Sequence, residues 1–291
     1  MKPALNHVLA IDIGNTRLKW ALHDGASWVA QGAHSTRDTM VPSMLVEEWA
    51  QLAAHLAPHA PPHLPNLRAI ISNVADHAAT KVVISALGAI GCSESELLVS
   101  KAAQCGVRNG YAEPAQLGTD RWLALIAAYA HMKRAIQTSG DTAYPQLVVM
   151  AGTALTIDAL TADGEFLGGV IVPGATLMRA ALSHRTARLP ADAGTHEIFP
   201  TRTENAIATG AIEACLGAIQ RMHHALGQRT GDVGTNINCI ASGGGMAYLQ
   251  PYLATLPFPV AIHDNLVLDG LIRVAYNIDR DIDRDPDCAI E

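Results

Sequence analysis

The chain has 291 residues, of which 49% are hydrophobic and 16% charged, and its formal net charge is −7. A chain of this length and hydrophobic content can form one large domain or two of ordinary size, each with a buried core, and its composition excludes global disorder. The acidic balance and the scattered Lys and Arg residues argue against a nucleic-acid partner. The longest apolar runs are too short to span a membrane, so no membrane partner is expected.

The cysteine pattern indicates a reducing compartment. Five cysteines lie far apart, and no C-x-x-C pair occurs among them, which argues against a disulfide framework or a zinc site. No long apolar signal core precedes the first expected strand. We therefore expect reduced thiols and a cytoplasmic protein.

The N-terminal part of the chain predicts an α/β fold. Apolar or alternating segments predict strands over 7–14, 17–24 and 27–33, with an Asp-Gly turn between the last two. The segments that follow predict, in chain order, a helix, a strand, a helix and a strand over 43–56, 68–75, 77–91 and 96–100.

A long helix and a repeat of the opening pattern come next. Residues 118–136 predict a helix that begins at Thr119 or Asp120. Residues 146–174 then repeat the order of 7–33: an apolar strand, a turn with Gly and Thr, a second strand, an Asp-Gly turn and a third strand. We interpret this repeat as an internal duplication.

The remainder of the chain supports the same interpretation. Helices are predicted over 175–189 and 204–227, a strand over 236–242, and a final strand and helix over 259–278. Two similar α/β domains that meet at a cleft would follow, with residues 1–120 in the first and 121–291 in the second.

The first turn of the chain has the residues expected of a phosphate site. Asp12 lies within an apolar strand, where a carboxylate is costly unless a cation or a hydrogen-bond donor meets it. The Gly14-Asn15-Thr16 turn can offer backbone N–H groups and a hydroxyl to an anion, and Lys19 can reach a phosphate. A magnesium ion bridging Asp12 and phosphate would complete the equipment for phosphoryl transfer.

Plainer interpretations exist for several of these residues. A Gly-Asn pair is more often an ordinary turn, and Asp120 alone is more simply a helix cap. The triple glycine at 243–245 is a loop that could also let an adenine approach the backbone. Tyr111 is most simply a loop anchor, and His223 is expected on the solvated surface.

Five segments, taken in order, resemble type III pantothenate kinases. They are Asp12-x-Gly14-Asn15-Thr16, Gly118-Thr119-Asp120-Arg121, Gly152-Thr153-Ala154-x-Thr156, GGVIVPG and RTARLP. That family belongs to the superfamily of sugar and acetate kinases, actin and heat-shock chaperones. The resemblance implies an α/β fold of two duplicated ribonuclease-H-like domains around a nucleotide cleft.

The resemblance also implies a reaction and its residues. The reaction is the ATP-dependent phosphorylation of pantothenate to 4′-phosphopantothenate, the first step of coenzyme A biosynthesis, carried out with magnesium by a homodimer. Asp120 would be the general base, and its place near a helix start predicts a low pKa. The implied nucleotide-binding residues are Asp12, Ile13, Gly14, Asn15, Thr16, Arg17, Leu18, Lys19 and Thr153, with Asp12 near the metal. The implied substrate-binding residues are Tyr111, Gly118, Thr119, Asp120, Arg121 and Thr186.

One position departs from the family pattern. The family usually has an aspartate two residues before the Gly-Thr pair, where it helps hold a monovalent cation such as K⁺, and this chain has Met150 there. A thioether is a poor ligand for a hard cation. We therefore expect no site for K⁺ or NH₄⁺, or a weak one built from other groups.

Two alternatives come from other functional classes. A kinase of the same fold could act on another small hydroxyl substrate, such as a sugar, although the G-T-D-R and T-A-R-L-P segments argue against it. A regulatory accessory factor of the same fold is the second alternative. The net acidity makes direct DNA binding improbable for such a factor, but it leaves a protein partner open.

Overall fold

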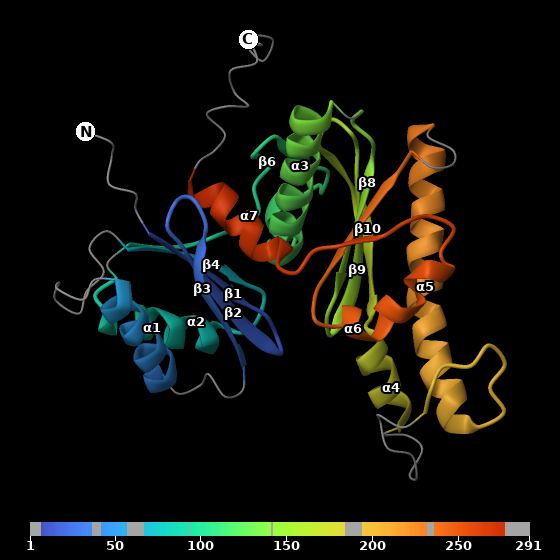
Figure 1. The fold of residues 1–291 in the computed structure, drawn as a ribbon, viewed down its shortest axis with the longest axis horizontal. Coiled ribbons are helices and arrows are strands. Elements are labelled where there is room, and N and C mark those ends of the chain that lie inside the picture. The colour runs from blue at the N-terminus through green and yellow to red at the C-terminus, as the bar shows by residue number, and fades with distance from the viewer. Residues whose placement is uncertain are drawn as a thin grey trace. The chain divides into compact units, whose positions relative to one another are not determined.

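The computed structural model describes residues 7–36, 42–56, 67–92, 94–140, 142–183, 194–231 and 236–276. It divides into two compact units, whose elements are labelled in Figure 1. Unit 1 holds the described residues of Met1–Gly106, Glu113–Ala127 and Val267–Glu291, and unit 2 those of Val107–Ala112 and Ala128–Leu266. Within the described ranges, no helix is long and apolar enough to cross a membrane.

Unit 1 is built on a five-stranded sheet with the order β3-β2-β1-β4-β5. Its strands are β1 (Val8–Ile13), β2 (Arg17–His23), β3 (Trp28–Ser35), β4 (Arg68–Asn73) and β5 (Glu94–Leu97). The first three form an antiparallel meander, and β4 and β5 continue the sheet parallel to β1. The expected strand over 96–100 begins and ends earlier, because β5 pairs with β4 only through Leu97.

Two helices supply the core on one face of this sheet. They are α1 (Pro42–Leu56) and α2 (His77–Ala89). Alternate residues of β1, such as Ile11 and Ile13, point into a cluster with Trp49 of α1 and Val83 of α2. The side chain of Asp76 caps α2 by accepting a hydrogen bond from the N–H of Ala79 at 2.9 Å.

The last described helix returns to unit 1. Helix α7 (Leu266–Ala275) packs on the start of α3 (Thr119–Ser139), where a Cβ at Gly270 would lie 2.2 Å from the carbonyl oxygen of Leu123. Arg68 of β4 also donates a hydrogen bond to the carbonyl of Ala275. The observed units therefore differ from the continuous division into 1–120 and 121–291, because a long-range contact outweighs chain order.

The second sheet has seven strands in the order β12-β11-β8-β9-β10-β7-β6. Their bounds are β6 (Ala103–Gln104), β7 (Val107–Asn109), β8 (Gln146–Ala151), β9 (Ala154–Leu160), β10 (Glu165–Pro173), β11 (Asn238–Ser242) and β12 (Ala261–Ile262). As in the first sheet, three antiparallel strands are followed by a strand parallel to the first of them. The predicted duplication is confirmed at the level of topology.

Helices complete unit 2. Besides the part of α3 from Ala128 onward, these are α4 (Ala175–Ser183), α5 (Thr203–Thr230) and α6 (Met246–Leu249), followed by the short 3₁₀ turn η3 (Gln250–Thr255). Another 3₁₀ turn, η2 (Pro114–Gln116), belongs to unit 1. The buried stripe of α5 packs on β8 and β9 through residues such as Cys215 and Ile219. His223 continues this stripe and stacks on Phe258, so its expected surface position is wrong.

Candidate active site

Asp12 lies near the carboxyl end of β1 with one polar neighbour on each adjacent strand. The register places Lys19 of β2 and Ser72 of β4 directly opposite it, so the three side chains share one face of the sheet. The Ser72 hydroxyl hydrogen-bonds the Asp12 carboxylate. Oxygen Oδ1 of Asp12 is shut off from solvent and has no hydrogen-bond partner among the described residues.

The surroundings of Asp12 oppose its ionisation. The pKa of this carboxyl is raised from 3.8 to about 7, mainly by burial and then by the negative charge of Asp120. The Lys19 ammonium and the Ser72 hydroxyl act in the opposite direction but do not cancel the effect. A partly buried carboxylate with one shielded and unpartnered oxygen fits a divalent cation, for which carboxylate oxygen is a suitable ligand.

The described residues include no group of three or more His, Cys, Asp or Glu that could hold a metal ion. A magnesium ion at Asp12 would therefore take most of its ligands from water and phosphate, as Mg²⁺ commonly does.

The turn after β1 is short and exposed. The N–H of Gly14 donates to the carbonyl of Arg17 at 3.0 Å, and the Thr36 hydroxyl donates to the carbonyl of Gly14 at 2.7 Å. Asn15, Thr16 and Arg17 are exposed at its tip. The turn thus presents three of the predicted nucleotide-binding side chains to solvent.

Two predicted members of this loop have another role. The side chains of Ile13 and Leu18 are fully buried in the core of unit 1. They can meet a nucleotide only through their backbone, and their side chains anchor the two strands on either side of the turn.

Helix α3 begins beside this site with the predicted Gly-Thr-Asp-Arg motif. The carbonyl of Gly118 accepts the first helical hydrogen bond from Trp122 at 3.0 Å, and Oδ1 of Asp120 accepts one from the N–H of Arg121 at 2.8 Å. A Cβ at position 118 would lie 2.7 Å from that same Oδ1. A side chain at position 118 would therefore force the Asp120 carboxylate out of this position, which is one physical reason for glycine in this motif.

The pKa of Asp120 contradicts the expectation from its place in the helix. Burial raises the pKa above its ordinary value, and the N–H and positive charge of Arg121 only reduce the rise. The helix start was expected to lower it, but desolvation is the larger effect here. Asp120 is therefore a stronger base than its position in the sequence predicts.

Ser72 is a residue of this site that the sequence did not predict. Thr119 is buried, and its hydroxyl lies 3.1 Å from that of Ser72, which is itself fully buried. Ser72 thus touches both the Asp12 side and the helix start. Its only signal in the sequence is a hydroxyl at the end of an apolar strand.

Unit 2 holds the second predicted turn. Gly152 and Thr153 are exposed between β8 and β9, and the carbonyl of Thr153 accepts a hydrogen bond from Gly174 at 2.9 Å. The glycine loop packs on the same end of β8, where a Cβ at Gly243 would lie 2.2 Å from the carbonyl oxygen of Ala151. Close backbone packing therefore accounts for the glycine at 243 without any contact to a nucleotide.

The remaining substrate-binding predictions have different outcomes. Tyr111 is half-buried in unit 2, where its ring stacks on Phe166 with centroids 5.6 Å apart. This contact agrees with its interpretation as a loop anchor. Arg121 is buried at the start of α3, and Thr186, with the rest of RTARLP, lies outside the described residues.

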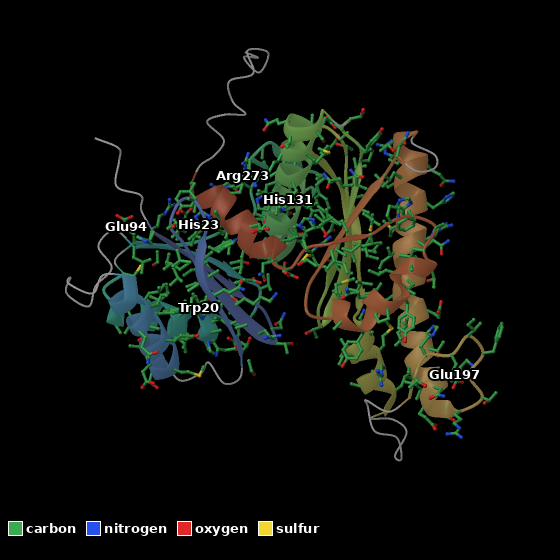
Figure 2. The ribbon with its side chains drawn as sticks, in the orientation of Figure 1. Trp20, His23, Glu94, His131, Glu197 and Arg273 are labelled. Atoms are coloured by element: carbon green, nitrogen blue, oxygen red, sulfur yellow. The ribbon has the colours of Figure 1, made fainter. Side chains whose placement is uncertain are left out.

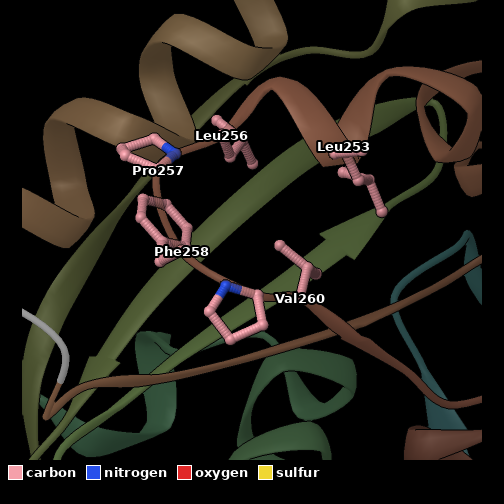
Figure 3. Close-up of a pocket in the computed structure, with 7 residues that line it drawn as sticks. Leu253, Leu256, Pro257, Phe258 and Val260 are labelled. Carbon is pink, nitrogen blue, oxygen red and sulfur yellow. The ribbon is translucent and has the colours of Figure 1, made fainter.

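A pocket elsewhere in unit 2 lacks the groups for this chemistry. It has a volume of about 450 Å³ and is formed by residues between Leu253 and Val260 (Figure 3). Its lining consists of Leu, Ala, Pro, Phe and Val side chains, which carry no titratable or hydrogen-bonding group. Its side chains therefore offer no group for proton or phosphoryl transfer.

Comparisons with known proteins point in one direction. Residues 8–225 match the family model of type III pantothenate kinases. The type III pantothenate kinase of Nitrosospira multiformis is 42% identical over 275 residues, which cover 94% of this chain and 92% of that protein.

Two solved structures share the fold at low identity. MreB5 of Spiroplasma citri bound to ADP aligns with a TM-score of 0.50 at 9% identity, covering 97% of this chain and 100% of that one. A conserved Campylobacter jejuni protein assigned to the Baf family of transcriptional activators aligns with a TM-score of 0.50 at 17% identity, covering 94% and 99%. At these identities the likeness concerns the fold alone.

The buried carboxylate predicts a gain of stability when it is removed. The folded chain binds the Asp12 proton more tightly than the unfolded chain, so it loses stability as the pH rises from about 4 to about 7. In metal-free buffer, Asp12→Asn should therefore raise the free energy of unfolding by about 2 kcal/mol at pH 8, with a smaller gain at pH 5. Urea unfolding at the two pH values measures both quantities.

Asp163→Asn is the control for this experiment. Hydrogen bonds from Thr161 and Arg108 lower the pKa of Asp163, so its replacement should give no gain at either pH. An equal effect of Asp12→Asn at pH 5 and pH 8 would contradict the assignment of a buried charge to Asp12.

Proposed function

The chain belongs to the type III pantothenate kinase family, so its reaction is the ATP-dependent phosphorylation of pantothenate to 4′-phosphopantothenate, and we propose that Asp120 is the general base. The observation that carries this proposal is the setting of the Asp120 carboxylate. It is held on the first turn of α3 by the N–H of Arg121, beside a glycine that leaves room for it, and burial raises its pKa.

The proposed step moves one proton. Asp120 accepts the proton of the primary hydroxyl of pantothenate as that oxygen attacks the γ-phosphorus, and the bond from phosphorus to the leaving oxygen of ADP breaks. The transition state of such transfers is loose, so a weak base that is well placed is sufficient. A raised pKa makes the ionised Asp120 carboxylate a stronger proton acceptor.

The nucleotide is proposed to bind at both turns. In unit 1, residues Asp12 to Lys19 would receive phosphate oxygens through backbone N–H groups and the Lys19 ammonium. Asp12 would hold magnesium, whose chemistry when bound is to neutralise phosphate charge. Thr153 would contact phosphate from unit 2, and its exposure at the tip of the second turn supports this role.

Pantothenate is proposed to bind the residues that the family motifs mark, four of which form the start of α3. The residues involved are Tyr111, Gly118, Thr119, Asp120, Arg121 and Thr186, on the strength of the family motifs. Arg121 is the one cation in this set, and it suits a carboxylate or the developing charge of the transferred group.

The site for a monovalent cation is proposed to be missing. Met150 lies two residues before Gly152, as Asp12 lies two residues before Gly14, and its strand partners are Thr156 and Ser242. The Thr156 hydroxyl has no hydrogen-bond partner among the described residues, and a thioether does not replace the missing carboxylate.

We also propose that the protein is a homodimer in the cytoplasm. Ile198 and Phe199 are 80% and 88% exposed, although the segment before them is fixed to α5. Glu197, labelled in Figure 2, donates through its N–H to Thr209 at 3.0 Å and accepts from Asn205 at 2.7 Å. Two apolar side chains held in solvent support burial against another copy. The cysteines among the described residues are buried and form no disulfide, which supports a reducing compartment.

Replacement of the base tests the central proposal. Asp120→Asn should lower kcat for pantothenate by about 10²–10⁴-fold, because the amide cannot take the proton. Purified protein, ATP, magnesium and pantothenate in a coupled assay for ADP give the rate. Asp76→Asn is the matched control, since asparagine caps α2 as well as aspartate and should leave kcat unchanged. A kcat of Asp120→Asn within threefold of wild type would overturn the assignment of the base.

The cation proposal predicts kinetics that do not depend on K⁺. Turnover measured with potassium chloride and with sodium chloride at equal ionic strength should agree within about twofold, because no carboxylate stands at position 150 to bind the ion. Activation by K⁺ or NH₄⁺ of tenfold or more would show that other groups build the site.

The dimer proposal predicts that one charge separates the subunits. Phe199→Glu should shift the mass measured by light scattering from two chains toward one, because burying an unpaired carboxylate is unfavourable. Gln220→Glu, the same new charge at an exposed position of α5, should leave the dimer intact. A wild-type protein that is monomeric at micromolar concentration is the result that rejects the proposal.

A further inference from the structure

Ser72 stands at a junction of three elements of unit 1. It belongs to β4, where Ala69, Ile70 and Ile71 are fully buried, and Ser72 itself is fully buried. The parallel register of β1 and β4 sets it beside Asp12, and its hydroxyl lies 3.1 Å from that of Thr119 in the first turn of α3. A polar group at such a position is unfavourable unless it is fully hydrogen-bonded.

The direction of these hydrogen bonds follows from their chemistry. Once Asp12 is ionised, as it would be beside a cation, its carboxylate can only accept, so the Ser72 hydroxyl donates its single proton to Asp12. At the 3.1 Å contact Ser72 must then be the acceptor, and Thr119 the donor. The result is a series of two hydrogen bonds, in which Thr119 donates to Ser72 and Ser72 donates to Asp12.

These two hydrogen bonds link the two acidic residues of the proposed reaction. Thr119, at one end of the series, is the sequence neighbour of Asp120, and Asp12 is at the other end. We infer that Ser72 is a positioning residue, whose hydroxyl aims the Asp12 carboxylate at a divalent cation and ties it to the helix start that carries Asp120. This inference rests on the proposed function of that site.

The second sheet offers a natural comparison. Ser242 of β11 is buried as Ser72 is, and the parallel register sets it beside Met150 as Ser72 is set beside Asp12. Ser242 therefore has the same strand setting but no carboxylate to hold. Removal of its hydroxyl removes a buried serine without touching an acid.

The experiment compares Ser72→Ala with Ser242→Ala. Mn²⁺ is the probe, titrated into ADP-loaded protein, and the free ion is counted by electron paramagnetic resonance. We expect Ser72→Ala to raise the Kd of Mn²⁺ at least fivefold and to lower kcat at least tenfold, with KM for pantothenate within threefold. Ser242→Ala should change each quantity less than twofold.

Two results would overturn the inference. One is wild-type Mn²⁺ affinity in Ser72→Ala, and the other is an equal loss of affinity in both alanine variants. If Ser72→Ala does not fold, Thr119→Val removes the outer donor at nearly constant volume and should still weaken Mn²⁺ binding at least twofold, while unchanged affinity overturns the inference.

Failure of the proposed base is distinguishable from failure of this inference. Asp120→Asn tests the base through kcat, whereas the role of Ser72 is read from Mn²⁺ affinity. Full activity of Asp120→Asn together with weak Mn²⁺ binding by Ser72→Ala would reject the base and keep the positioning role.

Discussion

A buried carboxylate that its own fold does not fully neutralise is the constraint on which the site of unit 1 depends. Lys19 and Ser72 offset only part of the desolvation of Asp12, and its pKa stays near 7. Such a group destabilises the free protein and is an attractive ligand for a cation. The tight turn, the in-register serine and the glycine at 118 are all devices that keep acidic groups in this unfavourable setting. They preorganise charge before substrate arrives, which is the usual source of enzymatic electrostatic stabilisation.

The two acids of unit 1 are coupled but not equivalent. Burial raises the pKa of each carboxyl, and the charge of Asp120 also raises the pKa of Asp12. Only Asp120 has an oxygen fixed by a neighbouring backbone N–H, whereas Asp12 keeps one oxygen without a partner. The first arrangement suits a group that receives a proton at a fixed point, and the second suits a group that binds a cation. Environment thus separates the roles of two identical carboxyl groups.

The sequence predicts those parts of the site that depend on local chemistry. The turn at Gly14, the helix start at Asp120 and the repeat of three strands follow from residue order, and the structure has all three. The burial that raises the pKa of Asp120 comes from distant elements, as does the contact of Gly270 with Leu123 that returns the last helix to unit 1. The role of Ser72 could not be predicted for the same reason, since its neighbours are set by strand register and by a helix from elsewhere in the chain. Local patterns carry no record of such contacts.

The duplication separates what the fold needs from what the chemistry needs. Both sheets have the same strand order around their first turn, and both have a buried serine on the adjoining parallel strand. The acid is present in one and replaced by Met150 in the other, where the strands pair without it. The sheet therefore does not require a carboxylate at this position, and β8 shows that an apolar residue serves there. The desolvation of Asp12 therefore has no counterpart in the needs of the sheet, which agrees with the role proposed for it toward a cation and phosphate.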